Sequence, residues 1–217
     1  MKKQYDTILF DLDGTLLDND ASFARAFRVM KMLYPETFSQ NVAFDLAGMI
    51  DLYKHHKPNP EGYLSEYCQK TGWVLERRPE AFVSFWFGLY LDYPVLYPEA
   101  LPLLRYLKEK NYKLGIVTNG NTLTQSRKLR SCGVDDLVEV SIISDSVGVA
   151  KPSPGIYYIA LERLQAKAEN ALFVGNNPDT DILGAINAGV DSFFIPGRTL
   201  TQTPTYIGEL KELFQLL

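Results

Sequence analysis

Cysteine is scarce in this sequence. Cys68 and Cys132 are the only two among 217 residues, and they lack the spacing of a metal site, so two reduced, packed thiols are favoured over a disulfide. Long apolar runs are lacking as well. Residues 1–6 are polar and lead into a short apolar run that ends at an acid, so we expect neither a signal peptide nor a membrane span there. Both observations favour a cytoplasmic protein.

An excess of basic residues is also lacking. The 22 Lys and Arg residues face 26 Asp and Glu residues, a formal net charge of -4, which argues against a nucleic acid polymer or an anionic membrane as partner. Internal repeats and low-complexity tracts are not evident. A chain of this length and composition is typical of a globular protein, with room for a main domain carrying a smaller insert. The oligomeric state is not indicated.

Short apolar runs recur along the chain, as expected of strands buried on both faces of a parallel sheet. The predicted strands are residues 7–10, 114–117, 140–143, 171–174 and 192–195. Helix-length segments separate the later strands, at residues 99–110, 121–132, 155–165 and 180–188. This alternation predicts an α/β fold with a Rossmann-like open parallel sheet.

The pattern changes between residues 17 and 93. No clear buried strand appears there, and helical stretches at 21–33 and 79–91 predict an inserted α-helical cap, which leaves residues 1–16 and 94–217 as the core. Aromatic residues of the insert are expected to form its own core: Phe23, Phe27, Tyr34, Trp73, Phe82, Phe85, Trp86, Phe87 and Tyr90. Its charged or titratable candidates for substrate contact are more simply surface residues: His55, His56, Lys57, Arg77 and Arg78.

Polar residues follow four of the predicted strands. Ligands of open α/β sheets bind beyond the carboxyl ends of the strands, so these positions are candidates for a site. They are Asp11-Leu12-Asp13-Gly14-Thr15, Thr118-Asn119-Gly120, Lys151-Pro152 and Gly175-Asn176-Asn177-Pro178-Asp179-Thr180-Asp181. We therefore expect four strand ends to supply polar groups to one rim of the sheet.

These residue types suit phosphoryl chemistry. Asp11 and Asp13 can bind a cation, and Asp11 can attack phosphorus to give an acyl phosphate. Asp13, further along the loop, can protonate a leaving alkoxide and then deprotonate water. Thr118 and Asn119 offer a hydroxyl and backbone donors to a phosphate, although alone they would more often be a helix cap. Lys151 can neutralise the nucleophile and the transferring phosphoryl oxygens.

In this order the residues resemble the four motifs of the haloacid dehalogenase superfamily: Asp-x-Asp-Gly-Thr, Thr/Ser-Asn, Lys-Pro and Gly-Asp-x-x-x-x-Asp. The resemblance spans nearly the whole chain. It implies a magnesium-dependent phosphatase that acts on a small phosphorylated metabolite through a phosphoenzyme at Asp11. It also implies that Asp13 is the acid and base, Thr118 and Asn119 bind phosphate, and Lys151 stabilises charge. The insert resembles the cap of phosphoglycolate-phosphatase-like and nucleotidase-like members.

One position departs from the family pattern. The superfamily usually has an acid after the glycine of the fourth motif, where this chain has Asn176. The resemblance implies a Mg2+ site at Asp11, Asp13, Asn176 and Asp181, with weakened affinity because Asn176 offers an oxygen without charge. The superfamily's dehalogenases, which need no metal, lack the second aspartate of motif one, so Asp13 favours phosphoryl transfer over dehalogenation. Two alternatives stay open: a phosphomutase, and a non-catalytic binding or regulatory module.

Overall fold

The computed structural model describes residues 4–36, 47–48, 65, 68–69, 72, 74, 78–196 and 206–217. Contacts within the chain divide it into two compact units, Met1–Asp18 with Leu96–Leu217, and Asn19–Val95. The boundaries expected from the sequence lie two residues before these divisions. The assignment of the units as catalytic core and cap stays a prediction, and each unit is described by itself.

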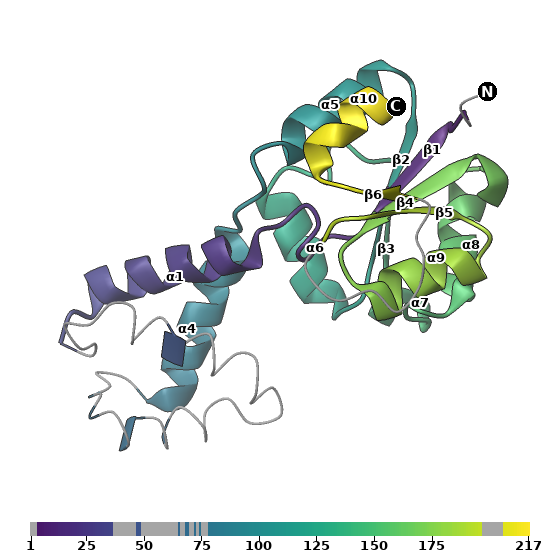
Figure 1. Cartoon of the computed structure of the whole chain (residues 1–217). Helices are drawn as coiled ribbons and strands as arrows, with labels where there is room; N and C mark the ends of the chain where they lie inside the picture. The colour runs from purple at the N-terminus through teal and green to yellow at the C-terminus, as the bar shows by residue number, and fades with distance from the viewer. Residues whose placement is uncertain are drawn as a thin grey trace. The chain divides into compact units, whose positions relative to one another are not determined.

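The larger unit contains a six-stranded sheet in the order β3-β2-β1-β4-β5-β6, and every neighbouring pair is parallel (Figure 1). The strands are β1 (Thr7–Phe10), β2 (Lys113–Thr118), β3 (Val140–Ile143), β4 (Ala171–Gly175), β5 (Asp191–Phe194) and β6 (Tyr206–Ile207). The sequence predicts the first five within two residues at each end. It misses β6, because two residues are too few to show a hydrophobic period.

Helices connect these strands, as the alternation predicts. The longer ones are α5 (Ala100–Glu109), α6 (Thr122–Ser131) and α8 (Pro154–Arg163). The helix expected at 180–188 is instead a π-helical turn, Pro178–Ile182, followed by α9 (Leu183–Asn187). The short elements that the sequence does not predict are α7 (Ser144–Val147), α10 (Leu213–Leu216) and the 3-10 turns Ala168–Asn170 and Leu210–Glu212.

The side chains of β1 alternate between two hydrophobic clusters, one on each face of the sheet. Ile8 and Phe10 belong to a cluster that includes Leu103 of α5. Leu9 belongs to the other cluster, with Ile156 of α8. Figure 1 shows α5 and α10 on one side of the sheet and α8 and α9 on the other. The α/β fold with a parallel sheet and a helical insert after β1 is therefore confirmed.

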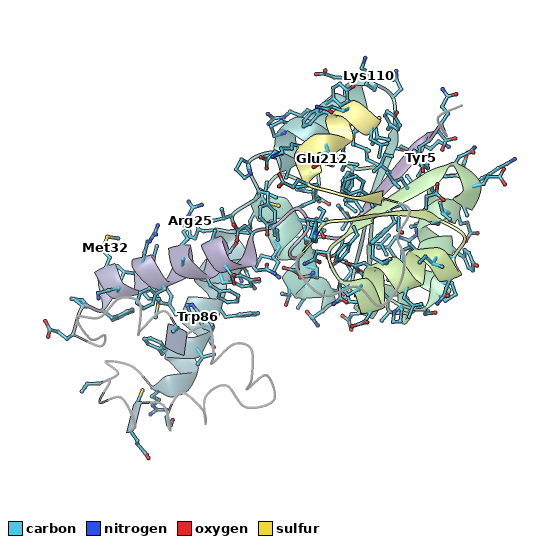
Figure 2. The ribbon with its side chains drawn as sticks, viewed as in Figure 1. Tyr5, Arg25, Met32, Trp86, Lys110 and Glu212 are labelled. Carbon is cyan, nitrogen blue, oxygen red and sulfur yellow. The ribbon has the colours of Figure 1, made fainter. Side chains whose placement is uncertain are left out.

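The smaller unit contains the helices α1 (Asn19–Leu33) and α4 (Pro79–Asp92), which contact each other. Phe23 of α1 stacks on Tyr90 of α4, with ring centroids 4.3 Å apart, and lies 5.7 Å from Trp86, which Figure 2 labels. Their cluster contains every aromatic residue expected there except Trp73, which lies outside the described residues. His55, His56, Lys57 and Arg77 also lie outside them, and Arg78 is exposed, as predicted.

The two cysteines meet the expectation from composition. Cys68 and Cys132 are free thiols, as predicted. Among the described residues, no helix is both long enough and apolar enough to cross a membrane. The cytoplasmic location stays a prediction.

Candidate active site

The predicted site residues meet at the carboxyl ends of three neighbouring strands. Asp11 follows β1, Thr118 ends β2, and Asn176 follows β4. Strand β1 pairs with β2 on one side and β4 on the other, so the chain order reverses there. A reversal of this kind leaves a crevice at the carboxyl edge of the sheet, where open α/β proteins bind ligands.

Asp11, Lys151 and Asp181 form a buried charged triad. The Lys151 Nζ lies 2.6 Å from Asp11 Oδ1 and 2.7 Å from Asp181 Oδ1, and all three residues are buried. Burial raises the pKa of the Asp11 carboxyl to about 7, although the Lys151 ammonium opposes this shift. Burial also lowers the pKa of Lys151, but its two carboxylate neighbours outweigh that effect and raise it. The lysine therefore stays a cation beside the candidate nucleophile.

The loop that carries Lys151 is fixed by Asn119. The Asn119 Nδ2 donates to the Lys151 carbonyl at 2.9 Å, and the Lys151 amide donates to Asn119 Oδ1 at 2.8 Å. The Lys151 ammonium also lies 5.4 Å from the ring centroid of Phe173. The Asn119 side chain is thus engaged by the lysine loop, so a phosphate contact from this residue would use its backbone amide.

Asp181 contacts both Lys151 and the backbone of the fourth motif. It lies in the π-helical turn Pro178–Ile182, a form that is rare and frequent at functional sites. Its Oδ2 accepts hydrogen bonds from the amides of Asn176, at 3.0 Å, and Asn177, at 2.9 Å. Because its Oδ1 pairs with Lys151, both carboxylate oxygens already have partners in the protein.

Tyr157 of α8 stabilises this turn through hydrogen bonds from its hydroxyl. Its ring is buried on α8 and contacts Phe173 edge to face, with centroids 5.0 Å apart. Its hydroxyl donates to the carbonyls of Asp181, at 2.9 Å, and Thr180, at 3.2 Å. The sequence analysis does not single out Tyr157, since a tyrosine on a helix looks like any other core aromatic residue.

The motif-one loop makes room for Asn176. Gly14 has a φ of +81°, and a Cβ there would overlap the Asn176 amide. The Thr15 Oγ1 donates to Asn176 Oδ1 at 3.4 Å. Glycine is therefore needed at position 14 both for its backbone conformation and for this close approach.

Two residues that the sequence analysis missed, Gln125 and Lys128 of α6, contact Asp13. The Lys128 Nζ donates to Asp13 Oδ1 at 2.8 Å and to Oδ2 at 3.1 Å. The Gln125 Nε2 lies 2.8 Å from both Asp13 Oδ2 and Thr118 Oγ1. All seven predicted site residues are thus linked, directly or through these two side chains.

A signal for these residues exists in α6. Gln125 and Lys128 are three residues apart, so they share one face of the helix. Both are buried, whereas the apolar Leu123 of the same helix is 79% exposed. Leu129 of the same helix is buried too, so the buried face of α6 mixes polar and apolar side chains, and the sequence alone does not show which face is buried.

The donor set fits magnesium. Asp11, the backbone carbonyl of Asp13 and the Asn176 amide group carry oxygen atoms at two adjacent strand ends, and Mg2+ prefers oxygen and usually takes one or two carboxylates. Within the described residues no group of three or more His, Cys, Asp or Glu side chains is placed to hold a metal, and Asn176 stands where the family pattern has an acid. Asp181 is less suited as a direct ligand, because its oxygens already accept protein donors.

Residues 5–189 match the family model of the haloacid dehalogenase-like hydrolases. The chain belongs to this family, and it is an enzyme of the phosphatase type that the family contains. The expectation of a non-catalytic module is therefore not supported.

Among curated relatives, the pyrimidine 5'-nucleotidase YjjG of Escherichia coli is 37% identical, over 99% of this chain and 98% of its own. The glyceraldehyde 3-phosphate phosphatase of Methanopyrus kandleri is 32% identical, over 84% of this chain and 80% of its own. Among solved structures, the putative hydrolase YfnB of Bacillus subtilis, bound to magnesium, has a TM-score of 0.75 at 25% identity and covers 99% of both chains.

Proposed function

We propose that this chain hydrolyses a small phosphomonoester in a magnesium-dependent reaction through a phosphoenzyme at Asp11. The observation that carries the proposal is the Asp11 carboxyl, buried beside the Lys151 ammonium at 2.6 Å, with Asp13 two residues further along the same loop. A nucleophile, a fixed cation and a second carboxyl group at one strand end are the parts that transfer of a phosphoryl group through an aspartate requires.

In the first half-reaction Asp11 attacks phosphorus. A bond forms between a carboxylate oxygen of Asp11 and phosphorus, and the bond from phosphorus to the leaving oxygen breaks. Asp13 gives a proton to that leaving oxygen, which departs as an alcohol. Lys151 offsets the negative charge that gathers on the phosphoryl oxygens, and the Thr118 hydroxyl donates to one of them.

In the second half-reaction water releases the phosphate. Asp13, now a carboxylate, accepts a proton from water as the water oxygen bonds to phosphorus. The bond between phosphorus and the Asp11 oxygen breaks, which yields inorganic phosphate and restores the Asp11 carboxylate. Asp11, the Asp13 carbonyl and Asn176 would hold Mg2+, which would supply charge stabilisation to the phosphoryl group in both halves.

The names of the relatives supply the first substrates to test. Two of these relatives are a pyrimidine 5'-nucleotidase and a glyceraldehyde 3-phosphate phosphatase, and another, of Thermus thermophilus, is a phosphoserine phosphatase with 32% identity over 72% of this chain. The shared chemistry is a phosphate monoester on a small polar molecule. We expect the physiological substrate in this class.

The test is release of inorganic phosphate from a panel of phosphorylated metabolites, with magnesium or with a chelator. Turnover that requires magnesium, with the dephosphorylated alcohol as the product, supports the proposal. Return of the phosphoryl group to a second position of a sugar, seen by product analysis, would indicate a phosphomutase instead.

Asp11→Asn tests the nucleophile in the same assay. The amide keeps the size of the carboxylate but cannot attack as an anion, so turnover should be abolished while the thermal unfolding profile still shows a folded chain. A soluble variant with a near-native rate would rule out this mechanism.

A further inference from the structure

The side chains of Gln125 and Lys128 join two parts of the site that lie on different strands. Lys128 contacts both oxygens of Asp13, at 2.8 and 3.1 Å. Gln125 contacts Asp13 and Thr118, each at 2.8 Å, and the Asn119 carbonyl at 3.4 Å. One helix, α6, thus reaches the loop after β1 and the end of β2 together.

In the ion pair between Lys128 and Asp13, the lysine is the buried member. The Lys128 side chain is 4% exposed, whereas that of Asp13 is 28% exposed. A buried ammonium is costly unless it is paired, so Lys128 restricts the Asp13 carboxyl to one position. The remaining exposed surface of Asp13 is the part that a leaving group or a water molecule can reach.

Gln125 determines the direction of the Thr118 hydroxyl. The Gln125 amide nitrogen has no acceptor capacity, so in this contact it donates and Thr118 Oγ1 accepts. The hydroxyl proton of Thr118 must then point away from Gln125 and is available to a phosphoryl oxygen. The same amide group donates to Asp13 Oδ2, which fixes the distance between the two functional groups.

We propose that Gln125 and Lys128 are positioning residues for phosphoryl transfer. Lys128 holds the Asp13 carboxyl group in place for its proton transfers, and Gln125 aligns the Thr118 hydroxyl for phosphate binding. The proposal rests on the proposed function, since it assigns these residues to the same reaction. Neither residue belongs to the four motifs, and each acts through a motif residue without touching the substrate.

A double-mutant cycle tests the role of Lys128. The variants are Lys128→Met, Asp13→Asn and the double variant, each assayed with magnesium on an alkyl phosphomonoester and on p-nitrophenyl phosphate. Lys128→Met should lower kcat for the alkyl ester by about a hundredfold, since misplacement of a catalytic group has this effect. The loss on p-nitrophenyl phosphate should be smaller, because its leaving group needs less protonation.

The decisive comparison is between the effect of Lys128→Met on kcat in the wild-type chain and its effect in Asp13→Asn. If Lys128 acts through Asp13, Lys128→Met causes no further loss there, and the two effects are not additive. Equal losses in both backgrounds would overturn the role of Lys128. If Lys128→Met does not fold, Lys128→Gln replaces it in the cycle, because a neutral amide donor is less costly to bury.

Inhibition by inorganic phosphate tests the role of Gln125. Gln125→Leu should raise the inhibition constant by about tenfold, because a misdirected Thr118 hydroxyl loses a hydrogen bond to a charged group. An unchanged constant in Gln125→Leu would overturn this part of the proposal.

Lys108→Met is the matched control. Lys108 lies exposed on α5, and its Nζ donates to the Asp136 carbonyl at 2.8 Å, so the same substitution there should leave every rate unchanged. The outcomes also separate the two proposals. A wild-type chain that turns over no phosphomonoester contradicts the proposed function, whereas additive losses in an active enzyme contradict only the positioning roles.

Discussion

The Asp11 carboxyl lies buried between the Lys151 ammonium and other carboxylates, so its protonation state depends on its neighbours. Burial raises its pKa to about 7, and Lys151 opposes the shift. An acid with a raised pKa stays neutral up to that pH, and it must lose its proton before it can attack phosphorus or bind a cation. The charge of the site near neutral pH therefore depends on what else is bound there.

Magnesium affinity should consequently fall as the pH falls below about 7. On the acid side each bound ion displaces a proton from Asp11, so the apparent affinity should drop about tenfold per pH unit, and above pH 7 it should level off. Calorimetric titration with magnesium across this range measures it. Asp11→Asn has no carboxyl to titrate and should show weak binding without this slope. A flat profile for the wild-type chain would contradict the prediction.

Asn176→Asp should tighten magnesium binding. The restored carboxylate adds a negative charge to a partly dehydrated site, and the apparent affinity should rise about tenfold or more. The measurement is activity against magnesium concentration at fixed substrate.

Asn177→Asp is the control for this change. Its side chain accepts from the amides of Asp179 and Thr180, a role that aspartate keeps, and it adds the same charge one residue away. Its effect on magnesium affinity should be smaller. An unchanged or weaker affinity in Asn176→Asp would mean that Asn176 is not a ligand.

At the scale of elements, the π-helical turn Pro178–Ile182 is the feature near the site that the sequence does not predict. Hydrophobic periodicity indicates a helix over this region, but five residues are too few to distinguish a π turn from an α turn. The turn directs the Asp181 carboxylate inward, where it holds Lys151 and the amides of Asn176 and Asn177. The Tyr157 hydroxyl of α8 donates to the carbonyls of Thr180 and Asp181 in this turn.

Tyr157→Phe should therefore weaken both stability and activity. Loss of the hydroxyl leaves the Asp181 and Thr180 carbonyls without this donor, and the bond to Asp181 is buried, which should lower the free energy of unfolding by about 1–3 kcal/mol. The value of kcat should fall as well, because a looser Asp181 no longer keeps Lys151 beside Asp11.

Tyr158→Phe is the matched control, because Tyr158 lies on the same helix and is exposed. It should change neither quantity. Urea denaturation and steady-state kinetics on both variants measure the effects, and equal behaviour of the two would argue against a role for the Tyr157 hydroxyl.

At the scale of the whole molecule, the chain divides into two units with separate hydrophobic clusters. Every predicted site residue lies in the larger unit, as do Gln125, Lys128 and Tyr157. The cluster of α1 and α4 includes Phe27, which is fully buried, and contains no residue of the larger unit. The metal site should therefore be independent of the packing of the smaller unit.

Phe27→Ala tests this independence. It should destabilise the smaller unit by about 3–5 kcal/mol, the usual cost of truncating a buried phenylalanine. Magnesium affinity, measured by calorimetry, should stay unchanged.

Leu103→Ala is the matching truncation in the larger unit, where Leu103 is a fully buried member of the hydrophobic cluster. It should lower the stability of the unit that contains the site and weaken magnesium binding at temperatures near its unfolding. A loss of magnesium affinity in Phe27→Ala at a temperature where the larger unit is folded would contradict the independence of the two units.

The sequence by itself determined the five longer strands, the helices between them and the residues at the strand ends. These depend on patterns within a few neighbouring positions, which hydrophobic periodicity and turn chemistry report directly. The departure at Asn176 was readable through the resemblance to the haloacid dehalogenase superfamily, whose fourth motif usually has an acid at that position.

Only the tertiary structure determines which side chains contact the predicted site residues. Lys128 and Asp13 are 115 positions apart, and Lys151 and Asp11 are 140 apart, so nothing local in the sequence links them. In the folded chain the side chains of Asn119 and Asp181 both contact Lys151. Gln125 and Lys128, which the sequence does not indicate, both contact Asp13. A hydrogen bond depends on distances of about 3 Å between atoms, and packing of the whole larger unit determines those distances.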